Sequence, residues 1–226
     1  MILKKIRFFP VIMLFIFALP VYPQSSSSGL SGNAIELYNT GRDLESLGQL
    51  EEADIYYDRV ISICNDEISR SIANRNTYTA LTWALLRQRK YRDVTVFGEQ
   101  ALRLYADEYR ITETLGEAYF HLYDYNNSLR HMQRYINYMP NGERISIAYF
   151  YVGEIYRIQE KYYLAEMAYS AAVRHQPGIA LWWYRLGSAR ENTGYPQPAA
   201  EAYERALALS PDYQAARDGL TRVRSN

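Results

Sequence analysis

Two glutamates are the residues of this 226-residue chain whose type and spacing best suit acid–base catalysis. Glu113 and Glu117 lie one helical turn apart. Two carboxylates on one face can have a raised pKa and serve as acid or base. Glutamates at this spacing are also common on exposed helix faces, and no nucleophile or loop-borne site accompanies this pair. We therefore do not expect an enzyme.

Metal and cofactor sites find no support either. His121, His131 and His175 lack the short spacing that metal ligands show. Cys64 is the only cysteine, so neither a disulfide nor a cysteine zinc site can form within one chain, and we expect a small buried thiol. The sequence has no glycine-rich phosphate loop and no serine elbow. It thus predicts no cofactor and no metal.

Composition and charge narrow the class of protein further. The chain has 48% hydrophobic residues, enough to bury a core, and equal numbers of basic and acidic residues, 25 of each. Nucleic-acid binding needs clustered Lys and Arg, and no such cluster is present. The 23 tyrosines suit helix interfaces near water, because a ring can pack while its hydroxyl finds a partner. We expect no nucleic-acid partner.

The first 24 residues have the pattern of a secretory signal. An apolar run from Phe8 to Val21 follows three basic residues, namely Lys4, Lys5 and Arg7. The run is shorter than the ~20 residues that span a bilayer. No cysteine follows it, so we do not expect a lipoprotein. We expect an exported protein, periplasmic or envelope-associated, with an uncleaved anchor associated with the membrane as the alternative.

Five segments carry apolar or small residues at the i, i+3, i+4, i+7 spacing of one helix face. They are Leu37-Thr40-Gly41-Leu44, Tyr78-Leu81-Thr82-Leu85, Thr112-Leu115-Gly116-Tyr119, Tyr149-Val152-Gly153-Tyr156 and Trp183-Leu186-Gly187-Arg190. A second helical stripe follows each: Ala53-Tyr57-Val60, Val94-Gly98-Ala101, Ser128-Met132-Tyr135, Ala165-Tyr169-Ala172 and Ala199-Tyr203-Ala206. A repeat of paired helices predicts a solenoid.

A glycine stands at the same place in four of the five first stripes. Because glycine inside a helix costs about 0.5–1 kcal/mol relative to alanine, another helix must pass close there. We expect the second helix of the same hairpin, with its small residues Ala53, Ala165 and Ala199 facing the glycines. In the second unit Thr82 replaces the glycine, and Gly98 replaces the aromatic residue of the second stripe.

These units resemble the tetratricopeptide repeat family, whose pattern is Trp-x2-Leu-Gly-x2-Tyr, then Ala-x3-Phe, then Pro. The best match is formed by Trp183, Leu186, Gly187, Ala199, Tyr203, Ala206 and Pro211. The resemblance implies an all-α, right-handed solenoid of five helix-turn-helix repeats with a C-terminal capping helix. After a Ser/Gly linker at 25–33, the expected units are 34–67, 75–108, 109–142, 146–179 and 180–213, with the cap at 214–226.

Two interruptions of the period need an explanation. Seven extra residues, Ile68 to Asn74, separate the first two units, and about two helical turns of sequence predict a lengthened second helix. Three extra residues, Gly142 to Arg144, are expected to lengthen the loop before the fourth unit.

In the family that the repeats resemble, the first helices line a concave groove that binds a protein or peptide partner. The candidate groove residues are Tyr38, Arg42, Trp83, Arg110, Glu113, Glu117, Phe120, Phe150, Glu154, Arg157 and Tyr184. Aromatic rings would supply contact area and charges would fix the register of a bound segment. We therefore expect a non-catalytic interaction scaffold or adaptor in the cell envelope. A groove for a small ligand or glycan, and a self-associating homo-oligomer, are the alternatives, and the same residues could instead pack between helices.

Overall fold

The structure, a computed structural model, describes residues 30–225, and this part of the chain is built of helices without a strand. The expected leader, residues 1–24, lies outside the described residues. The helices are α1 Leu30–Ser46, α2 Leu50–Ser69, α3 Arg75–Arg87, α4 Tyr91–Leu104, α5 Tyr109–His121, α6 Tyr125–Tyr138, α7 Ile145–Ile158, α8 Tyr162–His175, α9 Ala180–Asn192, α10 Pro196–Leu209 and α11 Gln214–Ser225.

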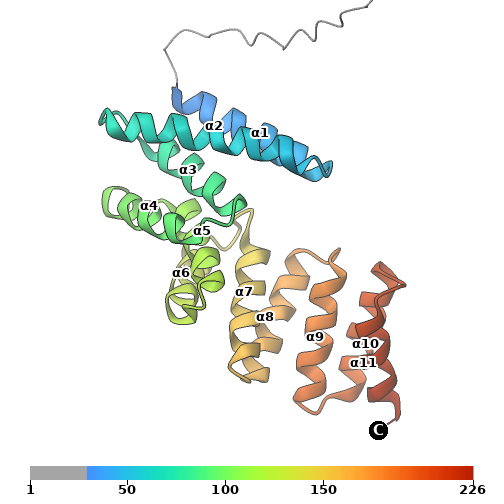
Figure 1. Cartoon of the computed structure of the whole chain (residues 1–226). Coiled ribbons are helices and arrows are strands. Elements are labelled where there is room, and N and C mark those ends of the chain that lie inside the picture. The colour runs from blue at the N-terminus through green and yellow to red at the C-terminus, as the bar shows by residue number, and fades with distance from the viewer. Residues whose placement is uncertain (1–29, 226) are drawn as a thin grey trace, which may run out of the picture.

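The helices form five hairpins that stack in chain order, with α11 closing the last one (Figure 1). Each odd-numbered helix from α1 to α9 packs on the even-numbered helix that follows it. The first helices also meet their counterparts in the next unit, α1 with α3, α3 with α5 and α5 with α7. The stack changes direction between α6 and α7 (Figure 1). The expected all-α solenoid of helical repeats is therefore confirmed.

In the first, fourth and fifth hairpins a tyrosine ring of the second helix lies against a glycine of the first helix. A Cβ atom added to Gly153 would lie 2.5 Å from Cε1 of Tyr169, and Gly187 is covered by Tyr203 in the same way. The close approach of the partner helix is thus confirmed. The residue that makes it is the tyrosine four positions after the alanine, whose longer side chain reaches the glycine, and not the alanine itself as we expected. Gly41 faces Tyr57.

Two units fill this contact differently. In the third unit the side chain of Met132 takes the place of the ring and lies against Gly116. In the second unit the glycine has moved to Gly98 on α4, and it faces the Leu115 side chain of the next hairpin. Thr82, at the usual glycine position, is fully buried and donates its hydroxyl to the Tyr78 carbonyl. A glycine is therefore present in each of these two hairpins, on the first helix in the third unit and on the second helix in the second unit.

The turn inside each hairpin contains one residue with left-handed backbone geometry. In chain order these residues are Gly48, Arg89, Tyr123, Glu160 and Gly194, with φ between 57° and 80°. Glycine adopts this conformation without the steric cost that a Cβ brings. Three of the five turns therefore carry a side chain where glycine would be favoured.

Two boundaries differ from the expected ones. Helix α2 is 20 residues long against 14 for α4, which agrees with a lengthened second helix, but it ends at Ser69. Most of the seven extra residues, Arg70 to Asn74, form the connection to α3. Helix α1 begins at Leu30, so the last residues of the expected linker 25–33 are helical.

The loop between α6 and α7 is the longest connection between units in residues 30–225, one residue longer than the Arg70–Asn74 connection after the first unit. It runs from Met139 to Arg144, whereas Tyr105–Glu108 and Gln176–Ile179 connect their neighbours. The predicted lengthening of this loop is therefore confirmed. Among residues 30–225, no helix has the length and apolar character that crossing a membrane requires.

Candidate functional site

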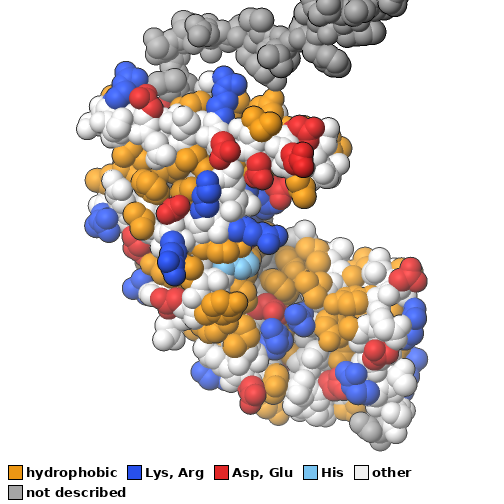
Figure 2. All heavy atoms as spheres, viewed as in Figure 1, with side chains coloured by type: hydrophobic (Ala, Val, Ile, Leu, Met, Phe, Trp, Pro, Cys, Tyr) orange, Lys and Arg blue, Asp and Glu red, His pale blue; other side chains and the backbone are white. Residues whose placement is uncertain are grey.

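A pocket of about 650 Å³ lies between the first helices α3 and α5 and the long loop before α7. We call it the Trp83 pocket. Its lining is Trp83, Asp107, Glu108, Tyr109, Arg110, Glu113, Tyr135, Met139, Asn141, Gly142, Glu143 and Arg144. Figure 2 shows one face of the molecule hollowed between the N-terminal helices and helices α7 to α9, with basic side chains beside the hollow.

Trp83 and Arg110 form one wall of this pocket. The Arg110 guanidinium carbon lies 5.9 Å from the centre of the Trp83 ring, within the range of a cation–π contact. Arg110 is held there by Glu108, to which its Nε and Nη2 atoms donate at 2.8 and 2.9 Å. The Trp83 ring also packs 5.1 Å from the ring of Tyr38 in the first unit. The wall is therefore a fixed aromatic surface bearing one neutralised cation.

Arg144 and Glu113 line another side of the pocket, and Arg144 also pairs with Glu117 just outside it. The Nε atom of Arg144 donates to Glu113 at 2.6 Å and its Nη2 donates to Glu117 at 2.8 Å. Burial raises the pKa of Glu113 to about 7; the nearby charge of Arg144 opposes this rise and that of Glu117 adds to it. The two carboxylates share one face, as the sequence suggests, but one guanidinium binds both. They form an ion-paired cluster and not a free acid–base pair.

Sequence reasoning missed Arg144, which we considered only as part of a lengthened loop. Its backbone N–H donates to the Tyr135 hydroxyl at 3.3 Å, which fixes the end of the loop against α6. Two adjacent charged residues, Glu143 and Arg144, stand in an insertion directly before a first helix. That combination was the available signal, because an insertion at this place can reach the preceding first helix.

Glu154, another candidate, is buried inside the fourth hairpin. The Tyr169 hydroxyl donates to it at 2.5 Å and Arg157 at 2.9 Å, while Arg185 of the next unit lies at 2.9 Å. Glu154 is buried, and these three side chains already pair with its carboxylate. Glu154 and Arg157 therefore stabilise the stack.

The same tyrosine–glutamate–arginine contact recurs at two other unit boundaries. Tyr57 donates to Glu45, which also pairs with Arg87 of the next unit. Tyr203 donates to Glu191, which pairs with Arg222 of α11. In each case the tyrosine is the one that covers the hairpin glycine. The abundant tyrosines thus pack with their rings and connect units with their hydroxyls.

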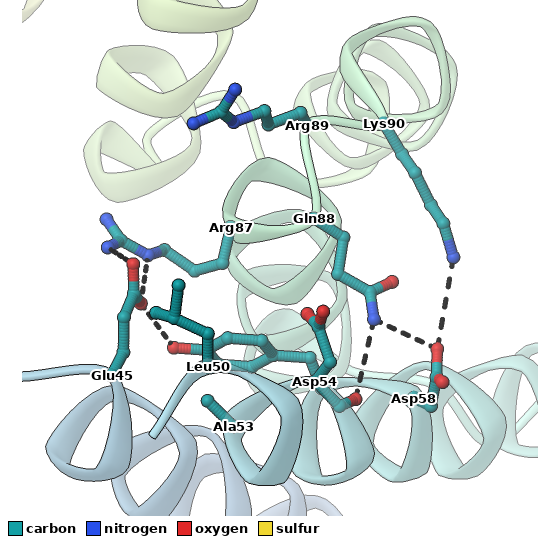
Figure 3. Close-up of a pocket in the computed structure, with 10 residues that line it drawn as sticks. Glu45, Leu50, Ala53, Asp54, Asp58, Arg87, Gln88, Arg89 and Lys90 are labelled. Atoms are coloured by element: carbon teal, nitrogen blue, oxygen red, sulfur yellow. Dashed lines mark hydrogen bonds and ion pairs between the residues drawn. The ribbon is translucent and has the colours of Figure 1, made fainter. Parts of the chain in front are cut away.

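A second pocket, of about 530 Å³, lies at the turns of the first two hairpins. Figure 3 shows that its polar groups face one another: Arg87 donates to Glu45, and Gln88 donates to Asp58 at 2.9 Å. Lys90 lies 4.0 Å from the same Asp58 carboxylate. Because these charges are paired within the pocket, we interpret it as a junction between the first two units.

The remaining aromatic candidates each pack against a ring of a neighbouring element. Phe120 lies 4.9 Å from Tyr151, Phe150 lies 5.1 Å from Trp182, and Tyr184 lies 5.2 Å from Tyr213. Tyr38 is only 8% exposed, whereas Arg42 is exposed. The first helices of successive units lie side by side, so a ring on this face covers the next helix. Of the candidates, the structure brings Trp83, Arg110 and Glu113 together in one pocket.

Each of the three histidines is stacked on a tyrosine. The ring centres of the pairs lie 4.4 to 5.8 Å apart, for Tyr91–His121, Tyr119–His131 and Tyr149–His175. Within residues 30–225 no group of three His, Cys, Asp or Glu side chains is placed to hold a metal ion.

Two parts of the chain match models of the tetratricopeptide repeat, residues 37–67 and residues 180–213. The comparison with curated protein sequences gave no match. Among solved structures, MamA is 19% identical, with 76% of this chain and 94% of MamA covered and a TM-score of 0.62. YrrB, described as a TPR protein with an unusual peptide-binding site, is 21% identical, with coverages of 82% and 90% and a TM-score of 0.55.

A third similar structure is the C-terminal part of a TPR repeat-containing protein from Cytophaga hutchinsonii. It is 14% identical, with 86% of this chain and 70% of that chain covered and a TM-score of 0.64. At these identities the likeness shows the fold. The repeat models match the first and the fifth hairpin, at the two ends of one continuous stack of helices. The first and the fifth hairpin thus match the tetratricopeptide repeat, and the described residues as a whole have the all-α solenoid fold of tetratricopeptide repeat structures.

Proposed function

We propose that this protein is a non-catalytic scaffold that holds a segment of another protein against the face formed by its first helices. The observation that carries the proposal is the Trp83 pocket, which combines an aromatic wall, charged groups and a volume of about 650 Å³. Pockets with a mostly apolar wall and a few placed polar groups suit an anchoring side chain of a partner. The similar YrrB structure is described as having a peptide-binding site.

We further propose that the protein works outside the cytoplasm, in the cell envelope. The basic start and short apolar run of residues 1–24 support this placement. A fusion of alkaline phosphatase to the C-terminus tests it, since that enzyme becomes active only after export. An inactive fusion that accumulates at the normal level would contradict the proposal.

A small-ligand groove is less well supported. Stacking a sugar or a drug-sized ligand needs free ring faces, and the rings of Phe150 and Tyr184 lie against Trp182 and Tyr213. Self-association, the second alternative, stays a prediction.

Photo-crosslinking in living cells tests the scaffold proposal directly. A photoreactive amino acid is placed at Asn141 or Arg42, on the proposed binding side, or at Met167, which is 69% exposed on α8. Adducts with one or two proteins from Asn141 and Arg42, and none from Met167, are expected. Equal adducts from all three positions, or none, would refute a groove partner.

A second test compares how much partner protein is recovered with a pocket variant and with a control variant. We choose Trp83→Ala and leave Phe150 intact, because Phe150 packs on Trp182 and Tyr169 and its truncation would disturb the core. Val96→Ala, at a 61% exposed position on α4, is the matched control. Because Trp83 packs on Tyr38, both variants are compared at a temperature at which each is folded, and Trp83→Ala should recover less partner than Val96→Ala.

A further inference from the structure

Glu113 has a carboxylate oxygen without a partner. The side chain is 1% exposed and lines the Trp83 pocket. Its Oε2 atom accepts from Arg144, but its buried Oε1 atom has no hydrogen-bond donor among the described residues. Buried polar atoms are nearly always paired, so an orphaned carboxylate oxygen at a pocket indicates a missing donor.

The charges around the pocket favour a cationic donor. Its lining holds four acidic residues, Asp107, Glu108, Glu113 and Glu143, against Arg110 and Arg144. Just outside, Arg75 pairs with Asp107 and Glu117 pairs with Arg144, and these two charges cancel. An excess of negative charge therefore remains in a partly enclosed space, where charge interactions are stronger than in water.

The walls suit the aliphatic part of a long basic side chain. Trp83, Tyr109, Tyr135 and Met139 line the pocket with rings and a thioether. Lysine and arginine pack their methylene groups along such surfaces while their charged ends reach a polar group. The Trp83 ring already accommodates a guanidinium from Arg110 at 5.9 Å, so the wall tolerates a cation beside it.

We infer that the Trp83 pocket recognises a lysine or arginine side chain of the bound segment, and that the charged end of this side chain donates to the free oxygen of Glu113. The inference rests on the proposed function, since it names the chemistry of the segment that the scaffold holds. Recognition by a buried carboxylate would select a basic residue at one position of the segment, with the neighbouring positions less constrained.

A display library of random 12-residue peptides tests the inference with the full chain as bait. Peptides selected by the wild type should be enriched in Lys or Arg at one position. Glu113→Gln, which keeps the shape and removes the charge, should lose that enrichment, and Val96→Ala should keep it. Selected peptides without a basic preference would overturn the inference and leave the scaffold proposal standing. A library that yields no peptide at all would overturn both.

A double-mutant cycle then assigns the contact. One selected peptide is measured with its basic residue and with norleucine in that place, against the wild type and Glu113→Gln. The norleucine peptide should bind the wild type about tenfold more weakly or worse, as for the truncation of a desolvated ion pair. Against Glu113→Gln the two peptides should bind alike. Should Glu113→Gln melt below the assay temperature, Glu143→Gln replaces it and should reduce the norleucine effect. An equal norleucine effect on wild type and on a folded variant would overturn the inference.

Discussion

The ring of Tyr169 lies against the backbone of Gly153, so closely that a methyl group on the glycine would come within 2.5 Å of ring carbon Cε1. Tyr169 is fully buried, and its hydroxyl is held by Glu154, so the ring cannot move aside freely. This contact fixes the distance between α7 and α8.

Gly153→Ala should therefore destabilise the protein. Overpacking a filled core costs about 1–3 kcal/mol, and the better helix propensity of alanine returns up to about 1 kcal/mol. We expect a net loss in the unfolding free energy of about 1 kcal/mol, and a larger one for Gly153→Leu, by denaturant titration. Gly178→Ala is the control, because a Cβ there meets nothing within 4 Å. Equal stability of the two alanine variants would show that the helices are not in tight contact.

Glu160→Gly should stabilise the fold. Glu160 has φ of 57° in the exposed turn between α7 and α8, at the place that Gly48 and Gly194 occupy in their hairpins. Relief of the left-handed strain, less the entropy cost of glycine, should add about 0.5–1 kcal/mol to the unfolding free energy. The reverse change, Gly194→Ala, should remove about as much. A lower melting temperature for Glu160→Gly would contradict this account of the turns.

The raised pKa of Glu113 predicts a dependence of stability on pH. The folded state keeps the Glu113 proton up to about pH 7, whereas the unfolded chain loses it near the ordinary glutamate pKa of 4.5. The folded state thus binds more protons between these values, and stability falls as the pH rises from about 4.5 to 7. Arg144 and Glu117 face this carboxyl and set how far the pKa moves.

Thermal melts at pH 5, 6, 7 and 8 measure the effect. The wild type should lose about 1 kcal/mol or more relative to Glu113→Gln across the window, and the two curves should become parallel only at about pH 8, where the folded state has also lost the proton. Glu160→Gln, at an exposed position, should follow the wild type. Parallel curves for wild type and Glu113→Gln from pH 5 upwards would mean that the carboxyl is ionised throughout.

Cys64 should be unreactive in the native protein. Its side chain is fully buried, and burial, followed by the charge of Glu67, raises the pKa of the thiol to about 12. Because the thiolate is the reactive form, a thiol reagent at pH 8 should modify the folded protein only at the rate of unfolding. In denaturant one thiol per chain should react at once. Rapid native labelling would place Cys64 at the surface.

The repeats could be predicted from the sequence because each position recurs. Gly153 and Gly187 occupy the same position in their helices. Because glycine lowers the stability of a helix, its recurrence at this position predicts a close neighbour. The identity of that neighbour was not predictable from the pattern alone. Alanine and tyrosine lie on the same stripe of the second helix, and only the crossing of the two helices decides that Tyr169 meets the glycine.

Only some residues of the Trp83 pocket could be predicted from the sequence. Trp83 and Glu113 stand out by residue type and helix face, but Arg144 comes from a loop 27 residues after Glu117, and repeat periodicity carries no information about an inserted loop. For the same reason Glu154 could not be told from Glu113 by pattern. The Glu154 carboxylate lies beside three side chains that hydrogen-bond or ion-pair with it, whereas Glu113 has one carboxylate oxygen without a donor.

The tyrosine–glutamate–arginine contacts also bear on how the molecule would respond to load. Each contact joins both helices of one hairpin to the next unit, as Tyr57, Glu45 and Arg87 do at the first boundary. In a linear stack every unit is held only by its neighbours, so these contacts lie in series. A pulling force applied to the two ends would meet the boundaries one after another, and the protein would lengthen in steps instead of giving way at once.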